Sequence, residues 1–361
     1  MTPRKRSVDF TDVEAQLRAL ERAGGEGELS FNRGETLHVS SLGKPFFPKA
    51  GVTKGDLMRY YTRVAPMLLP EIEGRALVLQ RHPDGVGGPM FFQQSAGEHV
   101  PDVVRVETLD TVDLGEKPRI IGGDLPTLLY TVQLGAIEVH PWLSRVDDIA
   151  TPDWCLIDLD PGDDVPFAHV AALARDVVRI ADQCGLTVAV KTSGASGIHI
   201  VLPLPPRTTY ETSADLALRL AEAVVATNPE RATLERGVKA RPKGSIYVDA
   251  LQNARGKSMA APYSVRAKPA ASVSAPLRAS ELTGRLRIET FTVKNMPARL
   301  TRTGDLWGEA IATRPSARAR ARAMATLQDA AVAPPPRRGS TRRGRAGGTH
   351  AGPATGRTRR A

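Results

Sequence analysis

The sequence predicts a mixed fold, α/β or α+β, with a substantial sheet, and three observations support this class. Short apolar runs of strand length recur at residues 76–80, 154–160 and 197–204. Stretches with helical spacing alternate with them at residues 53–69, 167–184 and 212–227. The chain has 361 residues, of which 41% are hydrophobic, which is enough for a large core in one or two domains. Strands interleaved with helices favour the mixed class.

The first half of the chain contributes two predicted helices and two predicted strands. Residues 11–23 have amphipathic spacing, with Thr11 at the N-cap position, Glu14 three residues later and a glycine pair at the end. A strand follows near residues 37–40, a helix covers residues 53–69, and a strand covers residues 76–80. Residues 128–139 are apolar but mixed in period, so helix and strand both remain open there.

In the second half of the chain, predicted strands and helices alternate more regularly. Residues 154–160 (WCLIDLD) predict a strand, and residues 167–184 predict a helix that Gly185 closes. Two further strands surround a Gly/Ser turn near residues 193–197, and a helix at 212–227 and a strand at 244–251 follow. We therefore expect most of the sheet to be formed after residue 150.

Several classes of protein are disfavoured by composition. No run of eighteen apolar residues exists, so no membrane span is expected, and the basic N-terminus lacks the apolar segment of a secretory signal. The two cysteines, Cys155 and Cys184, form no CxxC pair and suggest neither a zinc knuckle nor a disulfide framework. A cytoplasmic, nucleoid-associated protein is the simplest expectation.

Positive charge is concentrated at the C-terminal end. The whole chain carries a formal charge of +10, and residues 311–361 contain twelve arginines, no lysine and one acid, Asp329. The rest of the chain is close to neutral, so the excess lies in this tail. We predict that the tail is disordered and acts as a nonspecific nucleic-acid handle. The alternative is a solvated end without a role.

The most specific chemical signal is the pair Asp158 and Asp160. Residues i and i+2 of a strand point to the same face, and the flanking residues are apolar, so the strand is expected to be central. Paired carboxylates in such a place are costly without a cation, and an all-oxygen site favours Mg²⁺ or Mn²⁺. The alternative is an ordinary strand end with both acids in solvent.

A third carboxylate, Asp249, ends another apolar run. Three carboxylates on two strands are typical of the two-metal-ion sites that transfer phosphoryl groups. Between these acids in the chain, the turn from Ser193 to Gly197 could bind phosphate through backbone N–H groups. His199 follows it and is interpreted as a phosphate ligand or a proton donor to pyrophosphate, although a lone strand histidine is more often a core residue.

Other candidates are weaker by themselves. His140 could contact a ribose or primer end, or simply pack on Trp142. An exposed aromatic such as Phe92 could stack on a base, although a Phe-Phe pair is more often core. Basic residues after Asp249 could reach a triphosphate, and they are Arg255, Lys257, Arg266 and Lys268.

The order of these motifs resembles the polymerase domain of bacterial ligase D, in the archaeo-eukaryotic primase-polymerase superfamily. The motifs are HPW, LIDLDPG, KTSGxSGxHI, YVDxLQN and APYSVR, preceded by GVTKGDLMRYY, RHPDGV and FFQQ. The resemblance covers about residues 36–308. It implies a catalytic module with a central, mainly antiparallel sheet flanked by helices. The expected organisation is a helical extension (1–35), the catalytic domain (36–310) and a disordered Arg-rich tail (311–361).

The resemblance also implies roles for individual residues. Asp158, Asp160 and Asp249 would hold two metal ions, and Ser193, His199 and Arg266 would hold the phosphates of an NTP or dNTP. His140 would lie near the sugar, Phe92 would stack on the base, and Gln252 would line the pocket. Lys44 and Lys54 would bind the 5′-phosphate of a downstream DNA strand. Family members extend DNA ends or fill short gaps, usually with Mn²⁺ and ribonucleotides, together with Ku and an ATP-dependent ligase.

Some residues depart from the family pattern. Several members carry lysine where this chain has Gln80, Gln94 and Ser196, and each lost charge-assisted contact is worth roughly 1.5–3 kcal/mol. No KxDG ligase motif occurs, so a separate ligase is expected. Three alternatives remain open: a primase with the same triad, a catalytically silent DNA-end binding module that recruits a ligase, and a nuclease.

Overall fold

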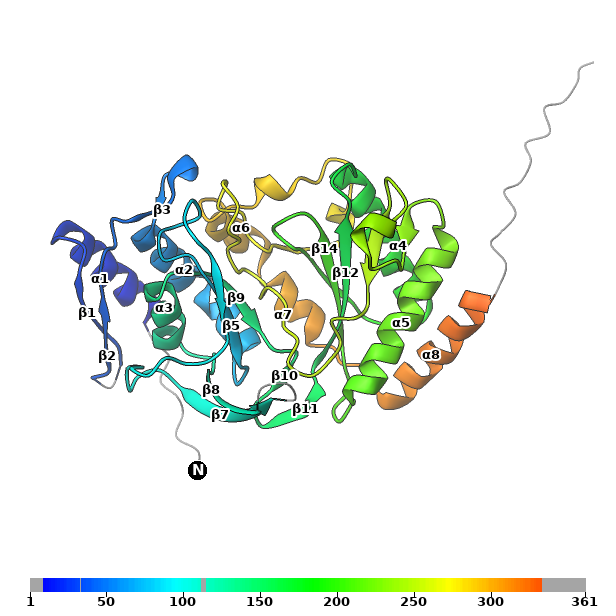
Figure 1. Cartoon of the computed structure of the whole chain (residues 1–361), viewed down its shortest axis with the longest axis horizontal. Coiled ribbons are helices and arrows are strands. Elements are labelled where there is room, and N and C mark those ends of the chain that lie inside the picture. Colours follow the sequence, from blue (N-terminus) through cyan, green and yellow to red (C-terminus); the bar gives the residue numbers. More distant parts are fainter. Residues whose placement is uncertain (1–8, 33, 112–114, 333–361) are drawn as a thin grey trace, which may run out of the picture.

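The computed structural model describes residues 9–32, 34–111 and 115–332. Two halves lie side by side in Figure 1, each built around its own sheet. The N-terminal half contains α1 (Phe10–Arg22), α2 (Lys54–Ile72) and α3 (Leu125–Gln133) with the sheet β6–β5–β9. The other half contains α4 (Phe167–Gln183) and α5 (Tyr210–Thr227) with a six-stranded sheet. The predicted mixed class is therefore confirmed.

The six-stranded sheet has the order β15–β16–β12–β14–β13–β17 and is antiparallel except between β15 and β16. Its longest strand, β12, lies inside the sheet between β16 and β14. The bounds are β12 (Trp154–Pro161), β13 (Ala189–Thr192), β14 (Ile198–Pro203), β15 (Ala232–Thr233), β16 (Ile246–Asp249) and β17 (Pro276–Leu277). This is the central, mainly antiparallel sheet that the motif resemblance implied.

The three-stranded sheet comprises β5 (Leu77–Arg81), β6 (Phe91–Gln93) and β9 (Ala136–Pro141). The segment at 128–139 that the sequence left open is divided, because α3 ends at Gln133 and β9 begins at Ala136. Shorter pairs complete the strands: β1 (Gly27–Ser30) with β2 (Thr36–Val39), β3 (Pro45–Phe47) with β4 (Val52–Thr53), β7 (Val106–Thr111) with β8 (Gly115–Ile120), and β10 (Ser144–Arg145) with β11 (Asp148–Pro152).

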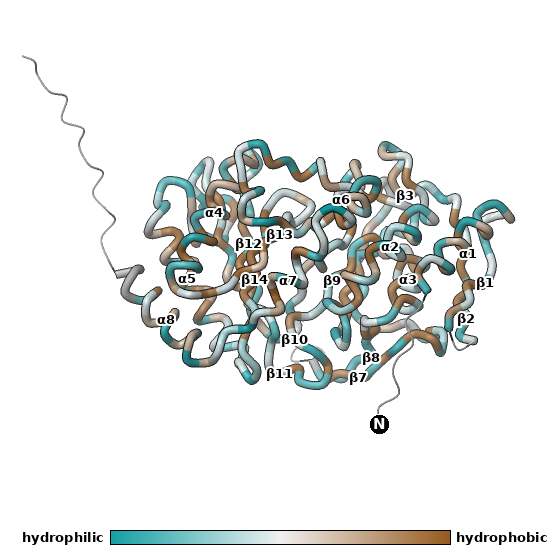
Figure 2. Tube along the Cα trace, turned by 180° about the vertical axis from the view of Figure 1, so that it is seen from behind, coloured by the Kyte–Doolittle hydropathy of each residue, from teal (hydrophilic) through white to brown (hydrophobic). Residues whose placement is uncertain are grey.

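One large apolar core runs through both halves. In Figure 2 hydrophobic segments concentrate along β12 and β14 and on α2 and α3. Apolar residues of β12 and β14, such as Ile157 and Ile200, are fully buried and pack under α4 and α5. The strands that carry the predicted acids are therefore held rigidly from behind. In the described part of the chain, no helix combines the length and apolarity that crossing a membrane requires.

The N-terminal extension is not a separate unit. Strand β1 pairs with β2 across the predicted boundary at residue 35, with Gly27 opposite Val39. Helix α1 buries Val13 and Leu17 and packs on α2. Ion pairs reinforce this contact, since Arg63 Nε donates to Glu14 at 2.9 Å.

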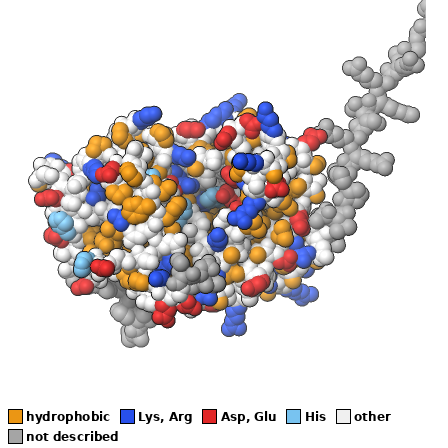
Figure 3. Space-filling model, viewed as in Figure 1, with side chains coloured by type: hydrophobic (Ala, Val, Ile, Leu, Met, Phe, Trp, Pro, Cys, Tyr) orange, Lys and Arg blue, Asp and Glu red, His pale blue; other side chains and the backbone are white. Residues whose placement is uncertain are grey.

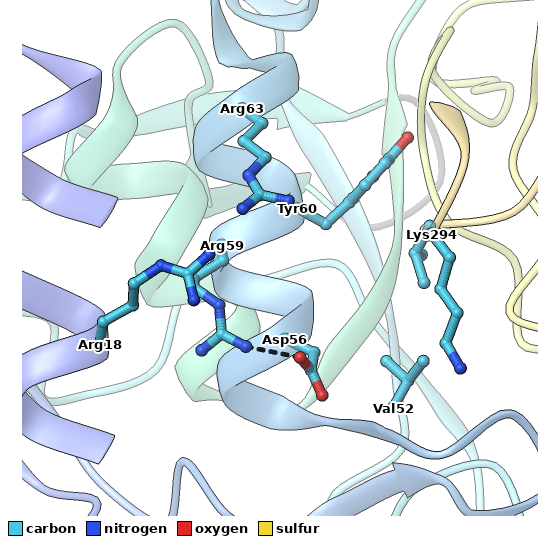
Figure 4. Close-up of a pocket in the computed structure, with 8 residues that line it drawn as sticks. Arg18, Val52, Asp56, Arg59, Tyr60, Arg63 and Lys294 are labelled. Carbon is cyan, nitrogen blue, oxygen red and sulfur yellow. Dashed lines mark hydrogen bonds and ion pairs between the residues drawn. The ribbon is translucent and has the colours of Figure 1, made fainter. Parts of the chain in front are cut away.

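Figure 4 shows the pocket of about 320 Å³ beside this contact. Arg59 bonds Asp56 in it and also contacts Glu21 of α1. Arg18, which also lines it, bonds Glu14 at 2.9 Å. Because these arginines are matched by acids, we interpret the pocket as part of the ion-pair network that joins α1 to α2.

The predicted disorder from residue 311 does not hold for its first part. The chain continues from α6 (Met296–Thr303) and α7 (Leu306–Ile311) into a further helix, α8 (Ala317–Val332). The segment is rich in alanine and arginine, which favour helix, and Ala323 and Leu327 are buried where α8 packs on α5. Arg320 also donates to Thr208 at 2.7 Å. Residues 333–361, the rest of the predicted tail, lie outside the described residues.

Candidate active site

The three predicted acids lie on paired strands. In the antiparallel register, Asp158 of β12 is directly opposite Asp249 of β16 on one side and His199 of β14 on the other. Residues opposite each other on neighbouring strands share a face of the sheet. Asp160 lies on the same face as Asp158, while Leu159 between them is buried on the other. Figure 3 shows charged and histidine side chains gathered at a hollow near the middle of the molecule.

Asp158, Asp160 and Asp249 lie close together on one face of the sheet, and their mutual repulsion disfavours all three being ionised without a cation. Burial, together with the neighbouring charges of Asp160 and Asp249, raises the pKa of Asp158 to about 7. The Asp158 side chain keeps 29% of its surface exposed, so it is reached by solvent rather than enclosed in the core. A cation at this place would relieve the repulsion.

The other two carboxylates are engaged by neighbours. Asp160 accepts a hydrogen bond from Arg241 at 3.1 Å. Asp249 accepts from the Tyr247 hydroxyl at 3.2 Å, from the Leu251 amide at 2.7 Å and from Gln252 Nε2 at 2.8 Å. Among the described residues, no three acidic, histidine or cysteine side chains are already drawn together as a metal-ligand group. The donors present are carboxylate oxygens, which suit Mg²⁺ or Mn²⁺, and binding would require Asp160 and Asp249 to exchange these partners.

His199 is buried and held on both sides of its ring. Its Nε2 lies 3.5 Å from Asp158 Oδ1, and its Nδ1 lies 2.6 Å from Nζ of Lys191. Burial lowers the pKa of His199 well below its usual value, and the charge of Lys191 adds to this effect. Neutral His199 can therefore act as a hydrogen-bond donor at one nitrogen and an acceptor at the other.

The Gly/Ser turn has a different internal structure from the one expected. Ser193 Oγ accepts hydrogen bonds from the amides of Ala195, Ser196 and Gly197 at 2.9–3.2 Å. The expectation that these N–H groups are exposed for phosphate is therefore wrong for this structure, because the serine hydroxyl already satisfies them. A phosphate could use them only by displacing Ser193.

Two glycines allow this turn to lie close to the acid strand. Gly194 has a φ of +74°, and a Cβ there would lie 2.9 Å from the Ser274 amide. A Cβ on Gly197 would lie 2.1 Å from the carbonyl oxygen of Leu159. Any side chain at Gly197 would therefore push the turn away from Asp158 and Asp160.

Glu138, which sequence reasoning missed, joins two predicted residues. This carboxylate of β9 is buried, and its Oε2 receives Arg266 Nε at 2.7 Å and His140 Nε2 at 2.9 Å. Although burial opposes the change, the hydrogen bond from His140 and the charge of Arg266 lower the pKa of Glu138 to about 2. Arg266 also donates to the Ser193 carbonyl, so this network connects the two sheets across the site.

The remaining nucleotide candidates lie on the smaller sheet or in loops. Gln80 of β5 lies opposite both Phe92 of β6 and Glu138 of β9, which places the aromatic ring in the same row as the Glu138 network. Phe92 is 56% exposed, as a surface that stacks on a base would be. Lys257 is exposed in the loop after β16.

Of the three positions where the family often has lysine, two have hydrogen-bond partners and one is exposed to solvent. Gln80 lies 3.3 Å from His82, Gln94 accepts from the buried Arg119 at 3.1 Å, and Ser196 is exposed. None of the three adds a positive charge to the site.

Lys44 and Lys54, which are predicted to bind a 5′-phosphate, are neighbours in the structure. The backbone amide of Lys54 donates to the carbonyl of Lys44 at 2.9 Å. Lys54 Nζ donates to the Ser40 carbonyl at 2.9 Å, and Lys44 Nζ pairs with Asp84 at 2.7 Å. Burial, and then the charge of Lys44, lower the pKa of Lys54 to about 8.

Three contributors were not among the predicted site residues: Glu138, Lys191 and Arg241. A charged residue inside an apolar strand is the signal that would have found the first two, since AIEVHP and AVKT each place one between buried neighbours. Arg241 follows a short 3₁₀ segment, η2 (Val238–Ala240), and no strand pattern marks it.

Comparisons with known proteins agree with this geometry. The family model of the LigD primase-polymerase domain matches residues 53–307. A multifunctional non-homologous end joining protein LigD from Pseudomonas aeruginosa is 31% identical over 301 residues, which are 82% of this chain and 35% of that protein. The bifunctional LigD of Bacillus subtilis is 32% identical over 269 residues, 74% of this chain and 43% of that protein.

A solved structure is also similar. The polymerase domain from Mycobacterium tuberculosis ligase D, in complex with DNA, has 30% identity and a TM-score of 0.71, and the match covers 77% of this chain and 99% of that one. The resemblance drawn from the motifs and the primase-like fold are thereby confirmed. The chain spans well under half the length of the two curated relatives described above.

Proposed function

Because the chain belongs to the family of LigD primase-polymerase domains, we propose that it is a DNA-end repair polymerase. It adds nucleotides to DNA 3′ ends and into short gaps by two-metal-ion nucleotidyl transfer, in nonhomologous end joining. The observation that carries this proposal is the row of Asp249, Asp158 and His199 across three paired strands. This row brings metal-binding oxygens and a phosphate-facing imidazole onto one face.

Asp158, Asp160 and Asp249 would hold two divalent ions, Mn²⁺ or Mg²⁺. When bound, these ions lower the pKa of the attacking 3′-hydroxyl and neutralise the triphosphate. Asp158 lies between Asp249 and His199 in the row, so it would hold metal beside both the other ligand strand and the imidazole. Arg241 and Gln252, which bond Asp160 and Asp249, would be released when the carboxylates turn toward metal.

The incoming NTP or dNTP is held by groups on both sheets. Arg266, positioned by Glu138, is suited to the triphosphate, as is His199 beside Asp158. His140 shares Glu138 and would contact the sugar, while exposed Phe92 would stack on the base. Ser193 keeps the turn closed beside these groups, and Lys257 would reach the phosphates from its loop.

The DNA contact is proposed from the lysine pair. Lys44 and Lys54 adjoin through their backbones and would bind the 5′-phosphate at the far side of a gap. The similar structure from Mycobacterium tuberculosis is a complex with DNA, which supports this class of ligand. Ku and a separate ATP-dependent ligase are the proposed protein partners, and the arginines of residues 333–361 would add nonspecific backbone contacts.

The proposal is tested by primer extension on a duplex with a short gap and a 5′-phosphate, with Mn²⁺ and either NTPs or dNTPs. We expect extension by one or a few nucleotides that Asp158→Ala abolishes. Comparing the two nucleotide pools assigns the sugar preference.

The same assay separates the alternatives. Product from a template without primer would identify a primase, and shortening of labelled DNA would identify a nuclease. A folded protein that binds the gap without extending it would contradict the polymerase and favour a silent end-binding module.

A further inference from the structure

Asn253 is a buried asparagine just beyond the end of β16, and its side chain bonds the backbone of β12. Its Oδ1 accepts from the Leu156 amide at 2.8 Å, and its Nδ2 donates to the Leu156 carbonyl at 2.7 Å. Asn253 is only 3% exposed. Bonding both backbone groups of one residue is what the opposite residue does in an antiparallel ladder, so the Asn253 carboxamide acts here as a substitute for backbone.

The register of β12 and β16 shows which residue Asn253 replaces. Asp158 lies opposite Asp249, and two residues further the same register would place Leu156 opposite Leu251. Strand β16 ends at Asp249, however, and Leu251 is 55% exposed. The Asn253 side chain therefore takes the place of a strand residue, which lets the chain leave the ladder directly after the acid without leaving the buried backbone of Leu156 unpaired.

The turn that follows Asp249 wraps around its carboxylate. The Leu251 amide donates to Asp249 Oδ1 at 2.7 Å, and Gln252 Nε2 donates to Oδ2 at 2.8 Å. Asn253 closes this turn, because its Nδ2 also donates to the Ala250 carbonyl at 2.8 Å. One side chain thus joins the turn that surrounds the acid to the neighbouring strand, β12.

Helix α5 fixes the orientation of the Asn253 carboxamide. Ser213 of this helix is fully buried, and its Oγ donates to Asn253 Oδ1 at 3.3 Å. With this bond, the two donor and two acceptor positions of the amide all have partners. A buried polar group that is satisfied in this way is rigid, because any rotation would leave several groups unpaired.

We propose that Asn253 is a positioning residue for Asp249. By standing in for the next strand residue, it holds the turn where the Asp249 carboxylate lies beside Asp158. The inference rests on the proposed function, because it takes Asp249 as a metal ligand. The bonds from Leu251 and Gln252 to the carboxylate would be exchanged when metal binds, whereas the bonds of Asn253 go elsewhere and are kept. The acid then changes partners on a turn that does not move.

Hydrogen exchange measures this anchoring without metal or turnover. Asn253→Ala leaves the Leu156 amide without its acceptor, so exchange at that amide should become about tenfold faster or more. The Leu251 amide bonds Asp249 and does not touch Asn253, and it should become faster as well if Asn253 anchors the turn. Acceleration confined to Leu156 would mean that Asn253 serves only the strand, and it would overturn the proposal.

Affinity for Mn²⁺ tests the consequence for the acid. In electron paramagnetic resonance titrations, we expect Asn253→Ala to weaken Mn²⁺ binding by about 10- to 100-fold. The matched control is Asn228→Ala, since Asn228 is a buried asparagine at the end of α5 whose Nδ2 donates to the Val224 carbonyl at 3.0 Å. It should lower Tm and leave Mn²⁺ affinity unchanged. Equal affinity of the wild type and Asn253→Ala would contradict the proposal.

A milder variant covers the case in which Asn253→Ala does not fold. Ser213→Ala removes only the bond that orients the carboxamide, so exchange at the Leu156 and Leu251 amides should accelerate together, by less than in Asn253→Ala. Unchanged exchange at Leu251 in a folded Ser213→Ala protein would then overturn the proposal.

The two measurements separate this inference from the proposed function. If Asn253→Ala loses Mn²⁺ affinity but the wild type does not extend DNA, the proposed function fails and the positioning role stands. If the wild type binds no Mn²⁺, the two-metal site fails, and the exchange of the Leu251 amide alone decides the role of Asn253. If the wild type extends DNA while Asn253→Ala keeps both the Leu251 exchange rate and the Mn²⁺ affinity, the inference is contradicted.

Discussion

The two sheets of the molecule present their functional groups in different ways. In the six-stranded sheet, Asp249, Asp158 and His199 are directly opposite one another on paired strands backed by helices. In the three-stranded sheet, Phe92 lies on the short strand β6 and is exposed. Its buried polar residue Glu138 works by holding residues from elsewhere. We therefore propose that the six-stranded sheet carries the chemistry, and that groups positioned by side-chain contacts on the smaller sheet recognise the substrate.

The strongest test of this contrast is a substitution among the acids of the six-stranded sheet. Asp158→Asn keeps the shape of the side chain but removes the charge that would hold metal, so we expect the single-turnover rate of nucleotide addition to fall by about 1,000-fold or more. Asp163→Asn, at an exposed acid two residues beyond the strand, is the matched control. Similar rates for the two variants would remove Asp158 from the chemistry.

The second test addresses the network on the smaller sheet. Glu138→Gln leaves Arg266 and His140 without their shared carboxylate, and hydrogen bonds of charged groups contribute about 1.5–3 kcal/mol. We expect kcat/KM for the nucleotide to fall about 10- to 100-fold, mainly through KM. Glu116→Gln, at an exposed site on β8, should have no effect, and a loss confined to kcat would argue against a positioning role for Glu138.

The strand pattern explains how much of this could be read from the sequence. The strands with Asp158, Asp249 and His199 were predicted because apolar neighbours on both sides mark each of them. The motif resemblance implied that the sheet is antiparallel, but the register that places these three residues opposite one another came only from the structure. Arg241 and the bonds of Ser193 to its own turn depend on loop geometry, which has no period to reveal it.

In the C-terminal tail, by contrast, the sequence led to a wrong prediction for residues 317–332. Its arginines suggested disorder, but two small apolar residues one helical turn apart, Ala323 and Leu327, are enough to bury one face of α8 against α5. The hydrophobic pattern of such a short stripe is weak beside the four charged residues of the same helix, and tertiary packing decides the outcome.

A smaller effect is expected at the DNA-end contact. Lys54→Met should reduce the preference for a gap with a 5′-phosphate over one with a 5′-hydroxyl by about tenfold, as measured by binding of fluorescent gapped duplexes. Because the pKa of Lys54 is lowered to about 8, its charge is present below that pH, and the wild-type preference should decline above it. A preference that is equal in the variant would exclude Lys54 from phosphate binding.

The Arg-rich segment is expected to affect binding but not chemistry. Deletion of residues 333–361 removes eight arginines, so the dependence of log Kd on log salt should become shallower while single-turnover extension is retained. Deletion from residue 313 also removes α8 and should lower Tm, because Leu327 is buried. If deletion of residues 333–361 left the salt dependence unchanged, the prediction that this segment binds DNA nonspecifically would be contradicted.

The smallest expected effect concerns stability outside the site. Burial raises the pKa of Glu71 from 4.5 to about 7, although Trp307 Nε1 donates to it at 2.9 Å. The folded state therefore keeps a proton that the unfolded state releases between these values, and the free energy of unfolding should fall by about 3 kcal/mol as pH rises through this window. Glu71→Gln should flatten the profile in urea unfolding, and an unaltered slope would show that Glu71 titrates normally.

The central claim, that the carboxylates of β12 and β16 close around two metal ions, is tested most directly by Mn²⁺ binding. Electron paramagnetic resonance titration, with a nonhydrolysable nucleoside triphosphate present, should find two bound Mn²⁺ ions per wild-type chain. Asp158→Asn should lose at least one of them, while Asp163→Asn keeps both. Equal binding by wild type and Asp158→Asn would contradict the account.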